Sequence, residues 1–305
     1  MDIVITGANG FLGSHLVKKF IDNGDNVYAI VKSHSEDISQ ICECKHIIFS
    51  EISDLDSSIS RFKAIKNPIF FHLAWAGVNG QVKTNYSVQI SNIKMACDAA
   101  IFAKKLNSSC FLSSGTIAEN ATLSFPNLEY ISLGQMYSVS KKSTRLFLEV
   151  LCKNLSLPFV WMQFSNIYGP NNMTGNLISY TLSQLFKNQE ATFGPCLQPY
   201  DFIFVDDLIN AVFLLGKKNH HKYNNYFIGS GKPHLLKDYL LEVGNLCGKP
   251  QLLKFGVRPD DGIRYSISMF DNQNTVEEIG DYVSKTFDEG IKYTIANYRI
   301  GEKHD

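Results

Sequence analysis

The sequence predicts an α/β fold in which a doubly wound parallel sheet is followed by a smaller mixed α/β lobe. Apolar runs alternate with helical patterns through the first half of the chain, and these runs lack the polar–apolar alternation of a half-exposed strand. Strands that are apolar throughout are buried on both faces, as in a parallel sheet covered by helices. A glycine-rich turn also follows the first run. Sheets of this kind bind ligands beyond the carboxyl ends of their strands.

The elements follow one another in the order that a doubly wound sheet requires. Beyond Asn166 the rhythm loosens, because shorter runs such as DFIFV and NNYFIG are separated by segments rich in Gly and Pro. We therefore expect the main sheet in residues 1–165 and the lobe in residues 166–305, with some later segments returning to the main sheet. The predicted strands of the first half are DIVIT, NVYAIV, HIIFS, PIFFHLAW, SCFLSS and PFVWMQF, and the predicted helices run from about Ser14 to Asn23, near Val88 to Lys105 and near Tyr137 to Asn154.

Composition and charge exclude several classes of protein. With 305 residues, 45% hydrophobic and 19% charged, the chain is typical of a globular protein in water. Lys plus Arg and Asp plus Glu number 29 each, so no excess of basic charge points to nucleic acid or to a membrane surface. No apolar stretch approaches the roughly 20 residues of a membrane helix, and the N-terminus does not resemble a signal peptide. The seven cysteines are scattered and the histidines lack metal-ligand spacing, so we expect reduced thiols, no metal and a cytoplasmic location.

Residues 6–13 read TGANGFLG and join the first apolar run to the first helical segment. Gly7, Gly10 and Gly13 allow positive φ and close approach of a ligand or of another backbone. The helix N-terminus that follows presents unpaired N–H groups and a positive dipole end to an anion. An ordinary tight turn fits the glycine pattern alone equally well. As a phosphate site, the turn makes residues 1–165 a dinucleotide-binding domain and residues 166–305 a substrate-binding lobe.

A second motif decides between these interpretations. Tyr137 and Lys141 form YSVSK, and a spacing of four on a helix puts both side chains on one face. An ammonium favours a nearby phenolate, so we expect Lys141 to lower the pKa of Tyr137 from about 10 and to make it a usable proton donor and acceptor. The strand SCFLSS ends near Ser114 and Thr116, at the edge of the sheet where a substrate would lie. The three features in this order favour a catalytic site.

The segments TGANGFLG, HLAWAG, SSGT, YSVSK, NIYGPNN and DFIFVDDL occur in this order over nearly the whole chain. In these segments the sequence resembles the extended short-chain dehydrogenase/reductases that act on nucleotide-diphosphate sugars. The resemblance implies a Rossmann-type cofactor domain, a small C-terminal lobe and a nicotinamide cofactor. It also implies a homodimer that forms through two helices of each subunit.

The resemblance implies roles for particular residues. Ser114, Tyr137 and Lys141 match the catalytic triad, with Lys141 also holding the nicotinamide ribose. Asn166 matches the position that reaches the sugar nucleotide. The implied cofactor contacts are Gly7, Gly10, Phe11, Leu12 and Gly13 in the turn, Glu51 and Ile52 beside the adenine, Leu73 and Ala74 after His72, Asn92 on a helix, and Phe164 with Ser165 beside the nicotinamide.

The end of the second apolar run bears on the choice of cofactor. A site for NAD usually has an acidic residue there, which binds the ribose 2′-hydroxyl. Here Lys32, Ser33 and His34 follow NVYAIV, and an acid appears only at Glu36. A cation and a hydroxyl would instead receive a 2′-phosphate. NADP(H) is therefore favoured over NAD(H), the alternative being that Lys32 is a solvated loop residue.

Two reactions of the family are disfavoured by particular residues. Sugar 4,6-dehydratases of the family carry an Asp-Glu pair where this chain has Gly115 and Thr116, and the enzymes that epimerise C3 and C5 carry a cysteine and a histidine that the corresponding segments do not offer. The remaining prediction is NADPH-dependent reduction of the C4 keto group of a nucleotide-diphosphate 4-keto-6-deoxyhexose, which the family uses in surface polysaccharide synthesis. The alternatives are a 4-epimerase of a nucleotide-diphosphate hexose with tightly bound NAD, and a non-catalytic dinucleotide sensor.

Three positions depart from the pattern of the family, and one of them, Gln163 in place of a usual arginine, has no clear consequence. Tyr200 stands where many relatives have an arginine for the substrate diphosphate. Arg258 or Arg264 in FGVRPDDGIRYS could offset that loss, and we favour Arg258, although a surface salt bridge of Arg258 with Asp260 or Asp261 is the alternative. Trp75 is larger than the residue usual after HLA, and it either narrows the sugar pocket or packs.

Overall fold

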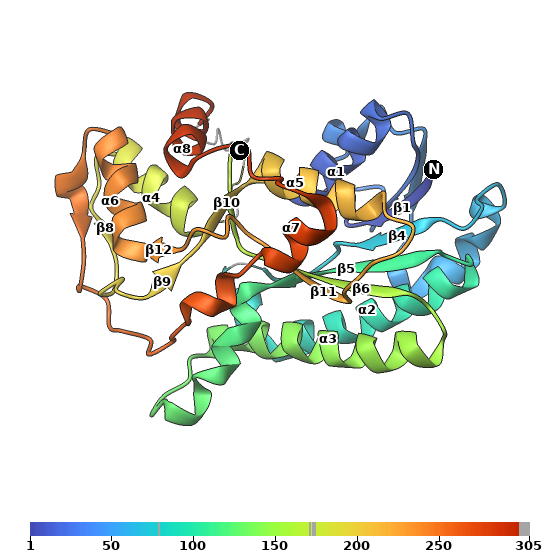
Figure 1. Cartoon of the computed structure of the whole chain (residues 1–305), viewed down its shortest axis with the longest axis horizontal. Helices are drawn as coiled ribbons and strands as arrows, with labels where there is room; N and C mark the ends of the chain where they lie inside the picture. The colour runs from blue at the N-terminus through green and yellow to red at the C-terminus, as the bar shows by residue number, and fades with distance from the viewer. Residues whose placement is uncertain (79, 171, 173–174, 299–305) are drawn as a thin grey trace.

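The computed structural model describes residues 1–78, 80–170, 172 and 175–298 (Figure 1). In this part of the chain seven strands form one sheet in the order β11-β6-β5-β4-β1-β2-β3, and every neighbouring pair is parallel. The direction of winding reverses between β1 and β4, so the predicted doubly wound α/β sheet is confirmed. The strands are β1 (Asp2–Thr6), β2 (Asn26–Val31), β3 (His46–Phe49), β4 (Ile69–His72), β5 (Cys110–Thr116), β6 (Phe159–Phe164) and β11 (Asn225–Ile228).

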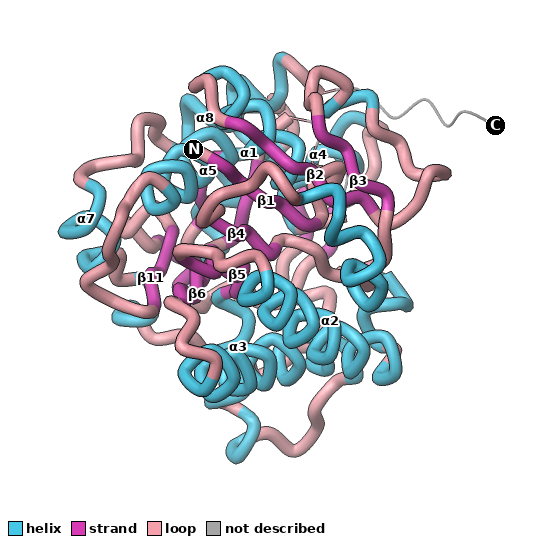
Figure 2. Tube along the Cα trace, turned by 90° about the vertical axis from the view of Figure 1, so that its right-hand side faces the viewer, coloured by secondary structure: helices cyan, strands magenta, loops and turns pink. Residues whose placement is uncertain are grey.

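The apolar runs form strands because helices cover both faces of the sheet. In β1, Ile3 and Ile5 belong to the core on one side, whereas Val4 belongs to the core on the other. Successive side chains of a strand point to opposite faces, so consecutive residues in the middle of such a strand are apolar. Figure 2 shows α2 and α3 on one side of the sheet and α1 and α5 on the other. These helices are α1 (Phe11–Asp22), α2 (Tyr86–Lys105), α3 (Met136–Asn154) and α5 (Val205–Gly216).

The second half of the chain adds β11 to the edge of the main sheet, beside β6, and builds a separate group of short elements. The short strands pair as β7 with β10, β8 with β13 and β9 with β12. Figure 1 places α4, α6 and α8 beside these strands, to the left of the main sheet. The elements are β7 (Asn166–Tyr168), α4 (Leu177–Phe186), β8 (Ala191–Thr192), β9 (Pro199–Tyr200), β10 (Phe202–Phe204), β12 (His234–Leu235), α6 (Leu236–Leu246), β13 (Leu253–Lys254), α7 (Gln273–Ile279) and α8 (Phe287–Ala296).

Helix α1 begins at Phe11, before the predicted start at Ser14. Gly10 is its N-cap, with an extended backbone, so the glycine turn leads into the helix without an intervening loop. Helices α2 and α3 begin at Tyr86 and Met136, close to their predicted starts. None of the helices in the described ranges is both long and apolar enough to cross a lipid bilayer.

Candidate functional site

The glycine turn after β1 is held by close backbone contacts that a side chain would break. Gly7 has a φ of +67°, and a Cβ atom there would lie 2.8 Å from the backbone of Ala74. A Cβ atom at Gly13 would lie 2.0 Å from the carbonyl oxygen of Gly7. Glycine is therefore required at both positions, since the turn packs against the chain after β4 and α1 packs against the turn.

The N-terminus of α1 lines a cavity of about 360 Å³. No side chain among the described residues caps this helix, so its first N–H groups are left for a ligand. Unpaired N–H groups and the helix dipole together suit a phosphate. Beyond the turn, the cavity is lined by Leu73 and Trp75 after β4, by Ser114 and Thr116 of β5, and by Tyr137 and Lys141 of α3.

The clash at Gly13 can be tested by mutation. Gly13→Ala should cost about 2–4 kcal/mol of unfolding free energy, because the methyl group would overlap the carbonyl oxygen of Gly7. Gly10→Ala is the matched control, since its Cβ would lie 3.2 Å from the same oxygen and its φ of −73° suits any residue. Denaturant unfolding measures the stability of both variants. Equal losses of stability in the two variants would contradict a role for the close contact at Gly13.

The predicted catalytic residues meet in this same cavity. Tyr137 and Lys141 lie one turn apart on α3, and Ser114 lies near the carboxyl end of β5. Lys141 is 3% exposed, and its Nζ donates a hydrogen bond of 2.8 Å to the carbonyl oxygen of Ser114. A helix of the outer layer and a strand of the sheet thus bring an amine, a phenol and a hydroxyl to the crevice beside the glycine turn.

Trp75 forms a wall of the cavity beside the catalytic residues. The Nζ atom of Lys141 lies 3.7 Å from the centre of the indole ring, and the Tyr137 ring meets the indole edge to face at 6.0 Å. The indole nitrogen donates to Oε1 of the buried Gln89 at 3.3 Å, which fixes the orientation of the ring. A cation over an indole face is an attractive contact. Trp75 therefore both packs and narrows the cavity.

Burial moves the pKa values of the two YSVSK groups in opposite directions. Desolvation raises the pKa of Tyr137 to about 12, which a hydrogen bond with Thr116 opposes and the charge of Glu119 reinforces. Desolvation lowers the pKa of Lys141 to about 7, and the carboxylate of Glu119 opposes this shift. The expectation that Lys141 lowers the pKa of Tyr137 is therefore wrong for the protein without a ligand. Desolvation of the phenol is the largest effect on its pKa, and burial also disfavours the charge of the amine that was expected to lower it.

Most of the predicted contacts line this cavity, and two others support its walls. The backbone of Ala74 lies against Gly7. Asn92 is buried, and its amide accepts from the N–H of Ala76 and donates to the carbonyl of Ala76, so it holds the loop after β4. The predicted residues that line the cavity are Gly7, Gly10, Phe11, Leu12, Gly13, Leu73, Ser114, Thr116, Tyr137, Lys141, Phe164 and Ser165.

Four predicted contacts neither line this cavity nor support its walls, and a fifth, Arg258, lies elsewhere in the lobe. Lys32 and Glu51 follow β2 and β3, with their charged atoms 3.8 Å apart and their side chains 70% and 57% exposed. Ile52 begins the 3₁₀ segment η2 (Ile52–Phe62) and packs against the core under it. Asn166 opens β7, and its amide donates to the carbonyl oxygen of Asp201 at 3.0 Å. The roles of these residues stay predictions.

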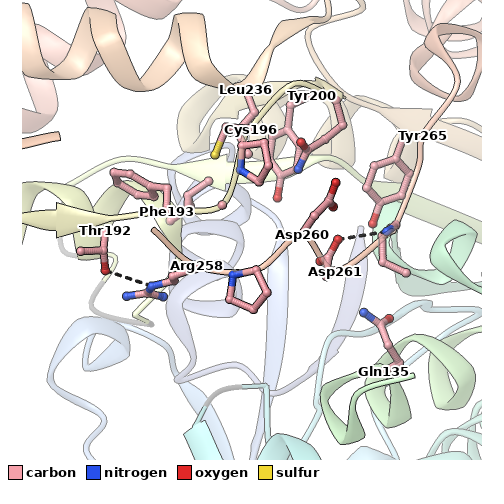
Figure 3. Close-up of a pocket in the computed structure, with 16 residues that line it drawn as sticks. Gln135, Thr192, Phe193, Cys196, Tyr200, Leu236, Arg258, Asp260, Asp261 and Tyr265 are labelled. Carbon is pink, nitrogen blue, oxygen red and sulfur yellow. Dashed lines mark hydrogen bonds between the residues drawn. The ribbon is translucent and has the colours of Figure 1, made fainter. Parts of the chain in front are cut away.

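Arg258 lines a second cavity of about 330 Å³ in the lobe (Figure 3). Its guanidinium donates to Thr192 Oγ1 at 3.1 Å and to the Tyr180 hydroxyl at 2.8 Å. The alternative, a surface salt bridge of Arg258 with Asp260 or Asp261, is not found among the described residues. Arg258 bonds to Thr192 and Tyr180 instead, and Asp260 pairs with Arg264 at 2.6 Å. Tyr200, which departs from the family pattern, lines the same cavity.

Sequence reasoning missed Glu119. Its carboxylate is fully buried, and Oε1 accepts from the indole nitrogen of Trp161 at 3.0 Å and from the backbone N–H of Thr116 at 3.3 Å. The spacing Thr-x-x-Glu is that of a capping box, so the sequence contained a signal for this helix start. Nothing in that spacing indicates that the carboxylate lies close enough to Tyr137 and Lys141 to act on their charges.

The fold is a doubly wound α/β sheet, and one cavity brings the glycine turn together with Ser114, Tyr137 and Lys141. Residues 3–229 match the model of the NAD dependent epimerase/dehydratase family, and the chain belongs to this family. The resemblance to the nucleotide-sugar group of the extended short-chain dehydrogenase/reductases is thereby confirmed.

Curated relatives and solved structures agree with this assignment. CDP-abequose synthase from Salmonella typhimurium is 24% identical over 303 residues, covering 95% of this chain and 96% of that protein. Protein CapI from Staphylococcus aureus is 24% identical over 282 residues, covering 82% and 84%. The structure of a UDP-N-acetylglucosamine 4-epimerase from Methanobrevibacter ruminantium M1 matches with a TM-score of 0.78 at 21% identity, covering 97% of each chain. The structure of a UDP-glucose 4-epimerase from Thermotoga maritima matches with a TM-score of 0.77 at 20% identity, covering 97% and 98%. These structures show the shared fold.

Proposed function

We propose that the protein is an NADPH-dependent reductase of the C4 keto group of a nucleotide-diphosphate 4-keto-6-deoxyhexose. The observation that carries the proposal is the meeting of Ser114, Tyr137 and Lys141 in one cavity with the uncapped, glycine-lined N-terminus of α1. The similarity to a CDP-abequose synthase over nearly the whole chain supports a sugar nucleotide as the substrate.

The residues present fit a nicotinamide dinucleotide. The turn at Gly7 and Gly13 has no room for side chains, and the free N–H groups of α1 suit a pyrophosphate. The Lys141 amine and the Phe164 ring both line the cavity, where the amine would donate to a ribose hydroxyl and the ring would lie beside the nicotinamide. When bound, the nicotinamide supplies the hydride that reduces the carbonyl carbon.

Tyr137 is suited to donate the proton that reduction requires. Because its pKa lies at about 12, the phenol keeps its proton at neutral pH. The Ser114 hydroxyl donates a hydrogen bond to the keto oxygen of the substrate, and Tyr137 gives its proton to that oxygen as negative charge develops on it. The Lys141 ammonium then stabilises the phenolate until it regains a proton from solvent. A 4-epimerase must first remove a proton from an alcohol, for which a phenol with a raised pKa is poorly suited.

The exposed Lys32 supports NADPH as the reductant. Its side chain is 70% exposed after β2, and its ion pair with Glu51 is long at 3.8 Å. Such an ion pair is weak in water, so Lys32 can leave Glu51 and bind a 2′-phosphate instead. The second cavity, with Arg258 at its wall, is the proposed site of the nucleotide diphosphate.

The reductase and epimerase proposals differ in net redox change. We expect the purified protein to carry little bound nicotinamide and to oxidise NADPH faster than NADH when a 4-keto-6-deoxyhexose linked to TDP, CDP, GDP or UDP is added. Absorbance of the reduced nicotinamide measures both rates. Interconversion of a nucleotide-diphosphate hexose with no NADPH oxidation, by a protein that retains NAD, would support the 4-epimerase instead.

We also propose a homodimer that forms through α2 and α3. Both helices leave large apolar side chains in solvent: Ile90 is 60% exposed, Phe147 58% and Val150 65%. Phe147 and Val150 are three residues apart on α3 and share a face. An apolar face of this kind on a water-soluble domain marks a surface for association.

The proposed dimer predicts the effect of charge on that face. Phe147→Glu combined with Val150→Glu should convert a particle of two chains into one of a single chain, because burying the new carboxylates in the interface is costly. Size-exclusion chromatography with light scattering measures the mass. Leu123→Glu, at a side chain that is 59% exposed but lies outside both helices, is the control and should leave the mass unchanged. A wild-type mass of one chain would refute the dimer.

A further inference from the structure

Glu119 is a fully buried carboxylate beside the catalytic residues that the proposed reaction does not use. It lies on the 3₁₀ segment η4 (Ile117–Leu123), which packs against α3. Oε1 accepts hydrogen bonds from Trp161 and from the backbone of Thr116. Oε2 is buried and has no hydrogen-bond partner among the described residues. The capping box thus accounts for one oxygen of this side chain and leaves the other unexplained.

Lys141 carries a buried positive charge that its hydrogen bond does not neutralise. Its ammonium is buried, and its hydrogen bond goes to the Ser114 carbonyl, which carries no net charge. An isolated buried charge is strongly destabilised, and two opposite charges near each other in a medium of low dielectric constant stabilise one another without touching. The charge of Glu119 does raise the pKa of Lys141 against the larger effect of burial.

We propose that Glu119 is a positioning residue of the site, a buried carboxylate that acts through Lys141 and keeps its amine charged. The charged amine is what can bind a ribose hydroxyl and stabilise a phenolate. The inference rests on the proposed function only in treating Lys141 as part of the working site. The unpaired Oε2 atom of Glu119 is then explained, because the positive charge of the Lys141 amine stabilises it without a hydrogen bond.

The other titratable groups around Lys141 cannot replace this carboxylate. Among the described residues, the Lys141 amine interacts electrostatically with His72 of β4 and Glu119 of η4. Tyr137 lies one turn away on α3, and Lys83 of η3 (Gly80–Thr84) lies over the Tyr137 ring. Burial lowers the pKa of His72 to about 3, so this imidazole is neutral. Burial also lowers the pKa of Lys83. Neither group supplies a negative charge near the amine at neutral pH.

Trp75 offers a readout of the Lys141 charge that needs neither cofactor nor substrate. The amine lies 3.7 Å from its ring centre, so loss of the proton should change the indole emission. We expect the fluorescence of the wild-type protein to change with a midpoint near pH 7, the pKa of Lys141, and Lys141→Met to lack this transition. In Glu119→Gln, which keeps an oxygen for Trp161 but removes the charge, the midpoint should fall by about half a pH unit or more.

Glu278→Gln is the matched control. Glu278 is also a buried carboxylate, and it accepts a hydrogen bond from Tyr226 on the far strand β11. This variant should leave the midpoint unchanged even where it lowers stability. An unchanged midpoint in folded Glu119→Gln would overturn the inference. If that variant does not fold, Glu119→Asp, which withdraws the charge by one carbon, should lower the midpoint by less, and a midpoint that stays or rises would overturn it equally. Because no turnover is measured, these outcomes are independent of which reaction the enzyme catalyses.

Discussion

Replacing Tyr137 by phenylalanine is expected to lower kcat by a factor of roughly 10²–10⁴ while leaving the affinity for NADPH nearly unchanged. The substitution removes only the hydroxyl, which is the proposed proton donor. The ring itself packs edge to face against Trp75 and lies under the Lys83 amine, and phenylalanine can keep both contacts. The substitution also removes the hydrogen bond between the Tyr137 hydroxyl and Thr116, so stability should fall by about 1 kcal/mol at most.

The rate of NADPH oxidation with a ketosugar substrate measures this prediction, and quenching of protein fluorescence by the cofactor measures binding. Tyr130→Phe is the control, because Tyr130 is 76% exposed in the loop before α3 and should give wild-type values for both. Wild-type turnover in Tyr137→Phe would refute the mechanism. Cofactor binding without turnover in the wild-type protein, for every ketosugar tried, would favour the dinucleotide sensor.

The local features of the cofactor half could be predicted from the sequence because they depend on short-range rules. A strand whose consecutive residues are all apolar, such as residues 3–5, has to be covered on both faces. A spacing of four residues puts Tyr137 and Lys141 on one side of any helix. The glycine turn is also a short-range feature, because the residues that contact one another in it, Gly7 and Gly13, are close in the sequence.

The electrostatics of the site could not be predicted in this way, because they come from residues far apart in the sequence. Burial of the Lys141 amine involves Trp75 from the loop after β4 and Ser114 from β5. The charge that opposes this burial comes from Glu119 on η4. A prediction from YSVSK alone counted the attraction between amine and phenol and left out the desolvation of both. Because of that omission, the pKa of Tyr137 was expected to fall, whereas in the structure it rises.

The lobe was hard to predict for a different reason. Its strands β8, β9, β12 and β13 are two residues long, too short for any periodicity to be recognised. Each exists because a distant segment pairs with it, as Leu253 pairs with Ala191. Arg258 was identified from the resemblance, but its bonds to Thr192 and Tyr180 depend on these pairings.

Replacing Lys141 by methionine is expected to abolish turnover and yet to stabilise the fold, by an amount that depends on pH. The pKa of Lys141 is about 7 in the folded protein against an ordinary 10.5. Below about pH 7 both the folded and the unfolded chain hold the proton, so the cost of burying the ammonium is fully present. Between pH 7 and 10.5 the unfolded chain binds the proton and the folded chain does not, so the stability of the wild type rises with pH.

The advantage of Lys141→Met should therefore be largest at acid pH, on the order of 2–4 kcal/mol near pH 6, and should shrink towards pH 10. The lost hydrogen bond to Ser114 and the uncompensated charge of Glu119 offset part of the gain. Urea unfolding of the wild type and of Lys141→Met near pH 6 and pH 10 measures this difference in stability. Lys63→Met, at an exposed lysine, is the control and should change stability by less than about 0.5 kcal/mol. A variant less stable than the wild type near pH 6, or an advantage that grows with pH, would contradict a buried charge at this position. Stabilisation together with loss of turnover would instead show that the buried amine is retained for its chemistry at a cost to the fold.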